Sequence, residues 1–242
     1  MDFLGIIPAR YASTRFPGKP LALIHGKPMI QWVYERAKQA DLQRVVVATD
    51  DERIREAVVS FGGEVVMTSP QHQSGTERCA EAAGLLQAKE EDVVVNIQGD
   101  EPFIHKESIN LLINQFQQDN VQIATLAKAF QGDEDPENPN RVKVVWSRSN
   151  RALDFSRSPI PYYRNGDGNK LYYKHIGIYA YRYQVLKEIV KLPVSDLENA
   201  EKLEQLRWLE NDYEVYVSPC DYESISIDTP EDLACAELIR DF

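Results

Sequence analysis

The sequence predicts an α/β fold, and three observations support this class. Through the first half of the chain, short apolar runs alternate with segments whose apolar residues recur at helical spacing. The runs are rich in Val and Ile and have no polar face, which is typical of strands buried on both sides in a parallel sheet. With 242 residues, 43% of them hydrophobic, the chain is long enough for one large domain with a substantial core.

Five apolar runs in the first half are expected to be strands, and they cover residues 3–7, 44–50, 64–68, 92–102 and 121–127. Helices are expected between them at 28–40, 51–63, 72–88 and 106–118. Pro28 suits the first turn of the first helix, and Gly62 or Gly63 ends the second. Ser74, followed by Glu77, forms a capping box for the third. Asp50 and Asp51 are assigned to capping the second.

The pattern changes after about residue 128. Three strand-like segments follow one another without helices between them, at 141–147, 152–156 and 170–182, which indicates antiparallel pairing. A helix is expected at 196–212, a strand at 213–217 and a final helix after Thr229 and Pro230. We therefore expect a single domain, 1–242, with a Rossmann-like mixed, mainly parallel sheet flanked by helices. A smaller β-rich lobe is expected within about 128–212.

Composition narrows the possible partners. The formal net charge of −11 leaves no broad basic surface for nucleic acid or for an anionic membrane. The three cysteines, Cys79, Cys220 and Cys235, have no metal-ligand spacing and are expected as free thiols. Apolar runs stay well below membrane-spanning length. These features predict a soluble cytoplasmic protein with no membrane insertion.

A cationic loop follows the first strand in the segment GIIPARYASTRFPGKPLALIHGKP, residues 5–28. Ligands of α/β folds bind at the carboxyl ends of strands, where this loop is expected to lie. The loop offers guanidinium groups, a hydroxyl and an ammonium, which suit a polyphosphate. These groups belong to Arg10, Ser13, Arg15 and Lys19. Neither GxxxxGK[ST] nor GxGxxG occurs, which argues against an NAD(P) oxidoreductase. A solvated basic loop remains the alternative.

Two aspartates are also expected at strand ends. Asp100 follows a central strand in NIQGDEP, and Asp228 precedes a helix cap in SIDTPEDL. Mg²⁺ is often held by one or two carboxylates together with phosphate oxygens and water. If the two strand ends are neighbours, both carboxylates could bind one Mg²⁺ beside a triphosphate. The alternatives are a turn role for Asp100 and a capping role for Asp228.

The chain resembles the bacterial 3-deoxy-manno-octulosonate (Kdo) cytidylyltransferases from Ile6 to about Leu233. The resemblance rests on six segments: IIPARYASTRFPGKPL, HQSGTER, NIQGDEP, HIGIYAY, EKLEQLRW and IDTPEDL. It implies a fold of the nucleotide-diphospho-sugar transferase type and a Mg²⁺-dependent, homodimeric, cytoplasmic enzyme. Such an enzyme transfers CMP from CTP to Kdo, releases pyrophosphate and supplies lipopolysaccharide assembly. The β-rich lobe would then serve sugar binding and dimerisation.

The resemblance also implies roles for individual residues. The nucleotide is expected to contact Arg10, Ser13, Arg15, Lys19, Ser74 and Arg78. Catalysis is expected to depend on Arg10, Arg15, Lys19, Asp100 and Asp228, with the two aspartates as metal ligands. The sugar side is expected to include Gln98, Arg157, His175, Tyr179, Glu204 and Gln205. The loop at 157–170 and the segment YESISID depart from the family pattern.

The residues alone leave alternatives on the sugar side. His175 and Tyr179 are four apart in an expected strand, so both should face the same side of the sheet, where they could equally belong to an aromatic core. Glu204 and Gln205 could belong to a solvated helix face. Rival functions are CMP transfer to another α-keto acid sugar, of the sialic acid or amino-Kdo type, and a non-catalytic nucleotide-binding regulator.

Overall fold

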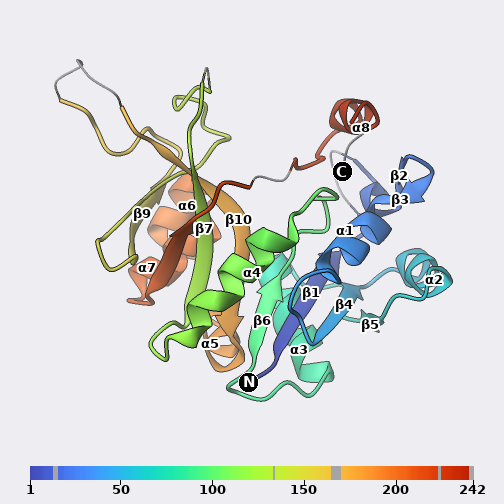
Figure 1. Ribbon diagram of the computed structural model, residues 1–242. Coiled ribbons are helices and arrows are strands. Elements are labelled where there is room, and N and C mark those ends of the chain that lie inside the picture. Colours follow the sequence, from blue (N-terminus) through green and yellow to red (C-terminus); the bar gives the residue numbers. More distant parts are fainter. Residues whose placement is uncertain (13–15, 133, 165–169, 223–224, 240–242) are drawn as a thin grey trace.

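A mixed sheet forms the centre of the computed structural model, which describes residues 1–12, 16–132, 134–164, 170–222 and 225–239 (Figure 1). Its main path runs in the order β11–β7–β10–β6–β1–β4–β5. The strands in chain order are β1 (Phe3–Ala9), β4 (Arg44–Thr49), β5 (Val65–Met67), β6 (Val93–Asn96), β7 (Ile123–Ala129), β10 (Tyr173–Arg182) and β11 (Val215–Pro219).

Most neighbouring strands on this path run parallel, as expected. β1 pairs in parallel with β4 and β6, β4 with β5, and β7 with β11. β10 is antiparallel to both of its neighbours, β6 and β7. Two further strands, β8 (Lys143–Trp146) and β9 (Ala152–Ser156), branch from β10 by antiparallel pairing. The β-rich region therefore extends the central sheet, and its assignment to sugar binding and dimerisation stays a prediction.

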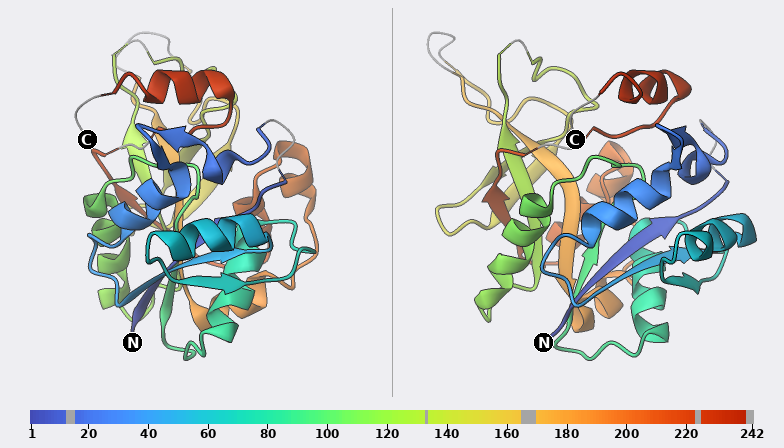
Figure 2. Two further views of the ribbon diagram at one scale, coloured as in Figure 1. Left: turned by 90° about the vertical axis from the view of Figure 1, so that its right-hand side faces the viewer. Right: turned by 45° about the vertical axis from the view of Figure 1, so that its right-hand side comes forward.

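Helices cover both faces of the sheet (Figure 2). One apolar cluster joins the strands to α1 (Met29–Ala37), α2 (Glu52–Ser60) and α4 (Lys106–Asn114). A second cluster joins the other face to α3 (Gly75–Leu85), α5 (Tyr183–Ile189) and α7 (Glu204–Glu210). The strands are thus buried on both sides, which explains their continuous apolar sequences.

The single helix expected at 196–212 is wrong. The segment forms two helices, α6 (Asp196–Glu201) and α7, because Lys202 adopts a left-handed conformation with φ 53° and ends α6. The expected strand 92–102 is shorter than predicted, since pairing ends at Asn96 and the following residues turn toward the sheet edge.

Three elements were not foreseen from the sequence: helix α5, the short helix η1 (Lys19–Leu21) and the hairpin of β2 (Leu23–Ile24) with β3 (Lys27–Pro28). The two-residue hairpin loop has φ 50° at His25 and φ 76° at Gly26, as tight hairpin turns require. A short helix, η2 (Gln115–Gln117), extends α4.

The C-terminal segment passes the carboxyl end of β6, where Ile227 bonds to Asp100, and ends in α8 (Pro230–Ala236), which lies near α1 and the β2–β3 hairpin (Figures 1 and 2). It packs there through a small apolar cluster that includes Ile24, Met29, Phe103, Ile227 and Ala236. Thr229 caps α8 and forms a capping box with Asp232. This docking places Asp228, which directly precedes the cap, beside the carboxyl edge of the sheet.

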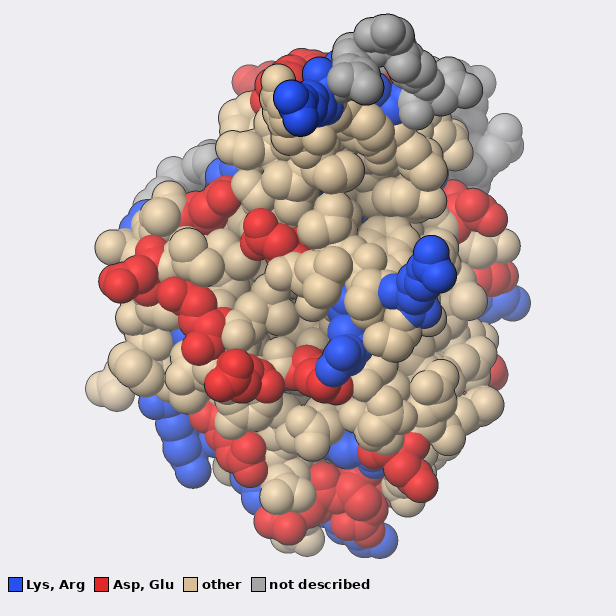
Figure 3. Space-filling view, turned by 90° about the vertical axis from the view of Figure 1, so that its left-hand side faces the viewer, with Lys and Arg blue, Asp and Glu red and all other residues tan. Residues whose placement is uncertain are grey.

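Figure 3 shows how charged side chains are distributed over one face of the molecule. Asp and Glu form a band below a largely uncharged centre, while Lys and Arg are scattered and form no broad patch on this face. This distribution agrees with the net charge of −11. Within the described residues, every helix is too short or too polar to span a bilayer.

Candidate active site

An open pocket of about 370 Å³ lies at the carboxyl ends of β1 and β6 and at the N-terminus of α3. Seven of the residues predicted for the site line it together, namely Arg10, Lys19, Ser74, Arg78, Gln98, Asp100 and Asp228. They come from five separated segments of the chain, which the parallel sheet brings to one edge. Ser13 and Arg15, two further residues predicted for the nucleotide, lie outside the described residues.

The base of the cationic loop is held by a turn at Gly18. Gly18 has φ 74° and donates its backbone N–H to the Tyr11 carbonyl at 2.9 Å. A side chain here would be strained by the positive φ, and its Cβ would come within 3.0 Å of the Tyr11 ring. Glycine therefore fixes the start of η1 and directs Lys19 into the pocket.

Asp100 and Asp228 converge on the Lys19 ammonium. Lys19 Nζ lies 2.7 Å from Asp100 Oδ2 and 3.1 Å from Asp228 Oδ1. The backbone N–H of Ile227 also donates to the Asp100 carbonyl at 2.9 Å, so the two segments that carry the aspartates are directly joined. The condition for a shared metal, that the two aspartates lie close together, is met. The strand end expected at Asp228 is wrong, because β11 ends at Pro219 and Asp228 lies in irregular chain just before α8. The turn and capping roles do not account for the position of either carboxylate.

This geometry fits a hard divalent cation, because two carboxylates already meet at one positive charge in a pocket open to solvent. Among the described residues, no group of three or more His, Cys, Asp or Glu side chains forms a metal-binding cluster. Mg²⁺ needs only one or two carboxylates when phosphate oxygens and water complete its shell. Asp100 and Asp228 are therefore suited to share Mg²⁺ with a bound triphosphate, and their role as its ligands stays a prediction.

The N-terminus of α3 forms another wall of the pocket. The Ser74 hydroxyl accepts the Glu77 N–H at 3.1 Å, and the Glu77 carboxylate accepts the Gln73 N–H at 2.7 Å. The predicted cap at Ser74 is thus confirmed, with the Glu77 carboxylate bonded one residue earlier than a standard capping box requires. Free amides at such a helix end favour an oxygen-rich ligand.

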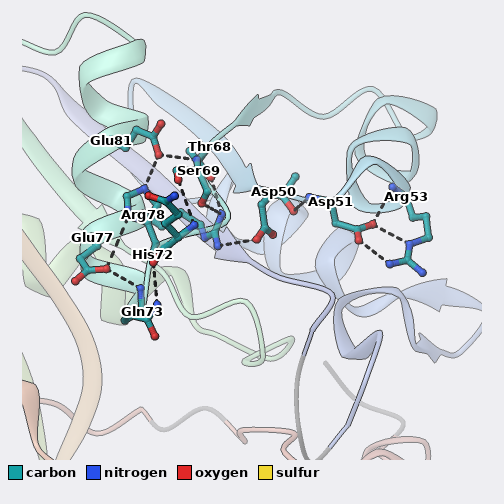
Figure 4. A network of polar contacts seen from close by, with 12 residues as sticks. Asp50, Asp51, Arg53, Thr68, Ser69, His72, Gln73, Glu77, Arg78 and Glu81 are labelled. Atoms are coloured by element: carbon teal, nitrogen blue, oxygen red, sulfur yellow. Dashed lines mark hydrogen bonds and ion pairs between the residues drawn. The ribbon is translucent and has the colours of Figure 1, made fainter.

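A buried arginine of α3 lies in a polar network beside this wall of the pocket (Figure 4). The Arg78 side chain, only 4% exposed, donates to Thr68 Oγ1 at 2.6 Å and pairs with Asp50 Oδ2 at 3.3 Å. The capping role expected for Asp50 is therefore wrong, because Asp51 caps α2 by accepting the Arg53 N–H and leaves Asp50 to pair with Arg78.

A carboxylate–imidazole contact continues the network. Glu81 accepts the backbone N–H of Ser69 at 2.8 Å and contacts the Nε2 of His72, which lines the pocket. The Ser69 carbonyl in turn accepts a longer bond from Arg78. No local pattern in the sequence indicates the parts played by Thr68 and Glu81. His72 is the first residue of the HQSGTER segment, so its position at the pocket could have been predicted from that segment.

Gln98 joins the pocket to β10. Its side chain donates to the Gly177 carbonyl at 3.1 Å, where the pairing of β10 shifts register between Ile176 and Tyr179. A Cβ added at Gly177 would meet no atom within 4 Å among the described residues, so the chain has open space here. The His175 and Tyr179 rings lie 5.2 Å apart, which confirms that they face the same side of the sheet.

The remaining sugar-side residues lie near α3, outside the group that lines the pocket. Glu204 accepts the Thr76 hydroxyl at 2.6 Å, and burial raises the pKa of its carboxyl. Gln205 is buried beside it in α7, and Tyr179 packs against Trp208 with ring centroids 5.0 Å apart. The solvated-face alternative for Glu204 and Gln205 is therefore wrong. Their contact with a sugar stays a prediction.

Arg157 lies farther away, at the break between α6 and α7. Its guanidinium donates to the carbonyls of Pro139, Glu201 and Lys202, and its backbone N–H donates to the Glu201 carboxylate. The structure therefore places Arg157 where it holds the segment that begins α7. Its predicted role as an anchor for the sugar would require these bonds to be exchanged.

His175 is a neutral imidazole at ordinary pH, because burial lowers its pKa to about 3 from a usual 6.5. Its Nε2 lies 2.9 Å from Thr125 Oγ1, and the Thr125 hydroxyl donates to the Ile178 carbonyl at 2.8 Å. The hydroxyl oxygen must then accept from Nε2–H, which leaves Nδ1 as an acceptor.

This burial gives the protein a specific sensitivity to acid. As the pH falls from 6.5 toward 3, the unfolded chain binds a proton at His175 that the folded chain excludes, so stability is lost. The free energy of unfolding of each protein is expected to fall when the pH is lowered from about 7 to about 5. For His175→Gln, this fall should be about 1–2 kcal/mol smaller than for the parent protein. Urea unfolding at both pH values measures this, with His25→Gln at an exposed position as control. Equal losses in all three proteins would contradict the assignment.

Comparisons with known proteins identify the family of this chain. The cytidylyltransferase family pattern matches residues 4–219. The chain is 59% identical to a 3-deoxy-manno-octulosonate cytidylyltransferase of Parabacteroides distasonis, with 96% of each chain covered. It is 57% identical to the enzyme of the same name from Bacteroides thetaiotaomicron, with 98% of this chain and 97% of that one covered.

Solved structures give the same result. A CMP:2-keto-3-deoxy-manno-octonic acid synthetase complexed with CTP superposes with a TM-score of 0.92, at 43% identity and 98% coverage of both chains. A 4-diphosphocytidyl-2C-methyl-D-erythritol synthase from Anaerococcus prevotii, at 15% identity, a TM-score of 0.63 and coverage of 98% of this chain and 95% of that one, shares the fold alone. The chain therefore belongs to the 3-deoxy-manno-octulosonate cytidylyltransferases, within the cytidylyltransferase family.

Proposed function

We propose that this protein transfers CMP from CTP to Kdo and releases pyrophosphate. The observation that carries the proposal is the pocket in which Lys19 lies within 3.1 Å of both Asp100 and Asp228, beside the amide-rich start of α3. Its curated relatives carry the name of this activity, and the similar solved structure contains CTP. The names of these relatives specify Kdo as the sugar, and none of them names a different keto sugar.

Phosphate positioning follows from the basic residues of the pocket. The anomeric hydroxyl of Kdo would attack the α-phosphorus in line, forming the new phosphorus–oxygen bond as the bond to pyrophosphate breaks. Such displacements need alignment and charge neutralisation more than covalent help. Arg10 and Lys19 line the pocket. They would hold the phosphates and stabilise the negative charge of the leaving pyrophosphate.

Asp100 and Asp228 would hold Mg²⁺ in this reaction. When bound, Mg²⁺ supplies positive charge to the phosphate oxygens and acidifies a neighbouring hydroxyl. The two carboxylates come from segments joined by a backbone hydrogen bond, so their separation is set before the substrates bind. Sequence and structure identify no separate general base among the described residues that line the pocket.

One assay tests the function. Purified protein with Mg²⁺ is given each of the four nucleoside triphosphates, with Kdo, an amino analogue of Kdo or a sialic acid as acceptor, and pyrophosphate release is measured. We expect release with CTP and Kdo to exceed every other pair by at least about tenfold, since a mismatched polar group costs at least this much. Equal rates with UTP would contradict cytidine selectivity, and a preference for sialic acid would contradict the choice of acceptor.

We also propose a homodimer, which acts in the cytoplasm and supplies activated Kdo for lipopolysaccharide assembly. An apolar groove of about 210 Å³ between β8, β10 and the 160–161 turn supports a contact with a second copy. Trp146 and Tyr173 line it, and Leu171 at its edge is 51% exposed. Light scattering is expected to give twice the chain mass, and Leu171→Asp is expected to shift the protein toward monomer. A monomeric parent protein would contradict the proposal.

A further inference from the structure

The Lys19 ammonium occupies the point at which the two aspartates of the pocket meet. Both of its contacts are short, 2.7 Å to Asp100 and 3.1 Å to Asp228. The Lys19 side chain is 14% exposed, and the carboxylates are 28% and 38% exposed. A monovalent cation thus holds the position that the proposed function gives to a divalent one.

Both sides of this contact are fixed by the backbone. On one side, η1 begins at the left-handed Gly18, and its second residue, Pro20, is buried. On the other, the Asp100 carbonyl accepts the N–H of the fully buried Ile227, and a Cβ at Gly99 would approach the Pro8 carbonyl at 2.9 Å. The two backbone segments therefore keep their places, and the contact is broken most readily by rotation of the long Lys19 side chain on its flexible four-carbon stem.

An ammonium and Mg²⁺ cannot both bind these carboxylate oxygens. Mg²⁺ requires oxygen ligands at about 2.0–2.1 Å, so it would draw both carboxylates onto itself. A lysine ammonium left within hydrogen-bonding distance would then repel the metal strongly in a partly buried site. Metal can enter only when Lys19 moves to another acceptor, and phosphate oxygens are strong acceptors for lysine.

We infer that Lys19 is a placeholder cation, which keeps divalent metal off Asp100 and Asp228 until a nucleoside triphosphate draws its ammonium away. The inference rests on the proposed function for the identity of that ligand. It makes metal and triphosphate binding interdependent, and such coupling must be reciprocal. Lys19 then acts in two stages. It first occupies the metal site as a positioning residue, and its ammonium contacts the phosphates afterwards.

Direct metal binding in the absence of nucleotide and sugar tests this role. We expect Lys19→Met, which keeps an unbranched side chain one atom shorter and removes its charge, to bind Mn²⁺ about tenfold more tightly than the parent protein. This size corresponds to the loss of two partly exposed ion pairs that compete with the metal. Electron paramagnetic resonance of free Mn²⁺ gives the affinity. Equal or weaker binding by Lys19→Met would overturn the inference.

Three variants make the result specific. Lys19→Arg keeps the charge and should bind Mn²⁺ as weakly as the parent, whereas tight binding would overturn the inference. Adding Asp100→Asn to Lys19→Met should abolish the gain, and a retained gain would show that the metal binds elsewhere and would also overturn it. Lys27→Met removes the same charge from a pair with Glu35 outside the pocket and should leave the affinity unchanged. A comparable gain in Lys27→Met would show a general charge effect and overturn the inference.

Thermal unfolding of each variant verifies that it is folded before the titration. The titration is independent of turnover, so the two proposals can fail separately. An inactive parent protein with CTP and Kdo would contradict the proposed function without affecting the Mn²⁺ comparison. An active parent with no gain in Lys19→Met would contradict the placeholder role alone.

Discussion

Asp100→Asn is expected to lower turnover with CTP, Kdo and Mg²⁺ by about 10²–10³-fold, the size typical for the loss of one preorganised charge interaction with a transition state. Asn keeps the shape of the side chain but not its charge, so Mg²⁺ loses one carboxylate and Lys19 loses its 2.7 Å partner. The fold should persist, because the backbone bond from Ile227 uses the Asp100 carbonyl and not its carboxylate.

Initial rates over a range of Mg²⁺ concentrations measure this effect. The concentration of Mg²⁺ needed for half-maximal rate should rise together with the loss of turnover. Asp119→Asn provides a matched control, since it removes the same charge from an exposed position before β7, at the opposite edge of the sheet. Near-normal turnover of Asp100→Asn with an unchanged Mg²⁺ requirement would remove the metal role of Asp100.

Because both aspartates serve one cation, their substitutions should not add. Asp228→Asn alone should cost a similar factor, and the double variant should cost little more than either single one, as occurs for groups that act as a unit. Fully multiplicative losses would indicate that Asp100 and Asp228 act at separate points. The convergence of both carboxylates on Lys19 Nζ argues for the shared site.

Arg78→Ala is expected to have a larger effect on stability than any of the other substitutions, a loss of about 2–3 kcal/mol in the free energy of unfolding. The change leaves Thr68 and Asp50 without their bonds to the guanidinium and opens space behind the start of α3. The KM for CTP should also rise, because α3 would lose the support that holds Ser74 at the pocket.

Urea unfolding near neutral pH gives the stability, and CTP titration of the assay gives the KM. Arg55→Ala is a suitable control, because Arg55 forms a surface pair with Glu52 within α2. Exposed pairs of this kind contribute at most about 1 kcal/mol. If Arg78→Ala and Arg55→Ala had equal effects on stability, the structural role assigned to the buried Arg78 in the network of Figure 4 would be wrong.

Local features of the sequence were sufficient for most of the fold. Apolar runs without a polar face located the strands of the parallel part, and capping residues such as Ser74 and Thr229 located helix starts. The break at Lys202 could not be foreseen, because the sequence on both sides of it favours a helix. At this break, Arg157 donates hydrogen bonds to the carbonyls of Glu201 and Lys202. The bonded residues are more than forty positions apart in the sequence.

The sequence by itself determined which chemical groups the pocket contains: a cationic loop after the first strand, a capped helix start, and the carboxylates of Asp100 and Asp228. Only the tertiary structure decided their pairing. Lys19 meets carboxylates that lie 81 and 209 positions away, and Asp50 turns from its own helix to Arg78. Local preferences act over a few residues, whereas these contacts depend on how the sheet and α8 pack, and packing brings together side chains with no local relation to one another.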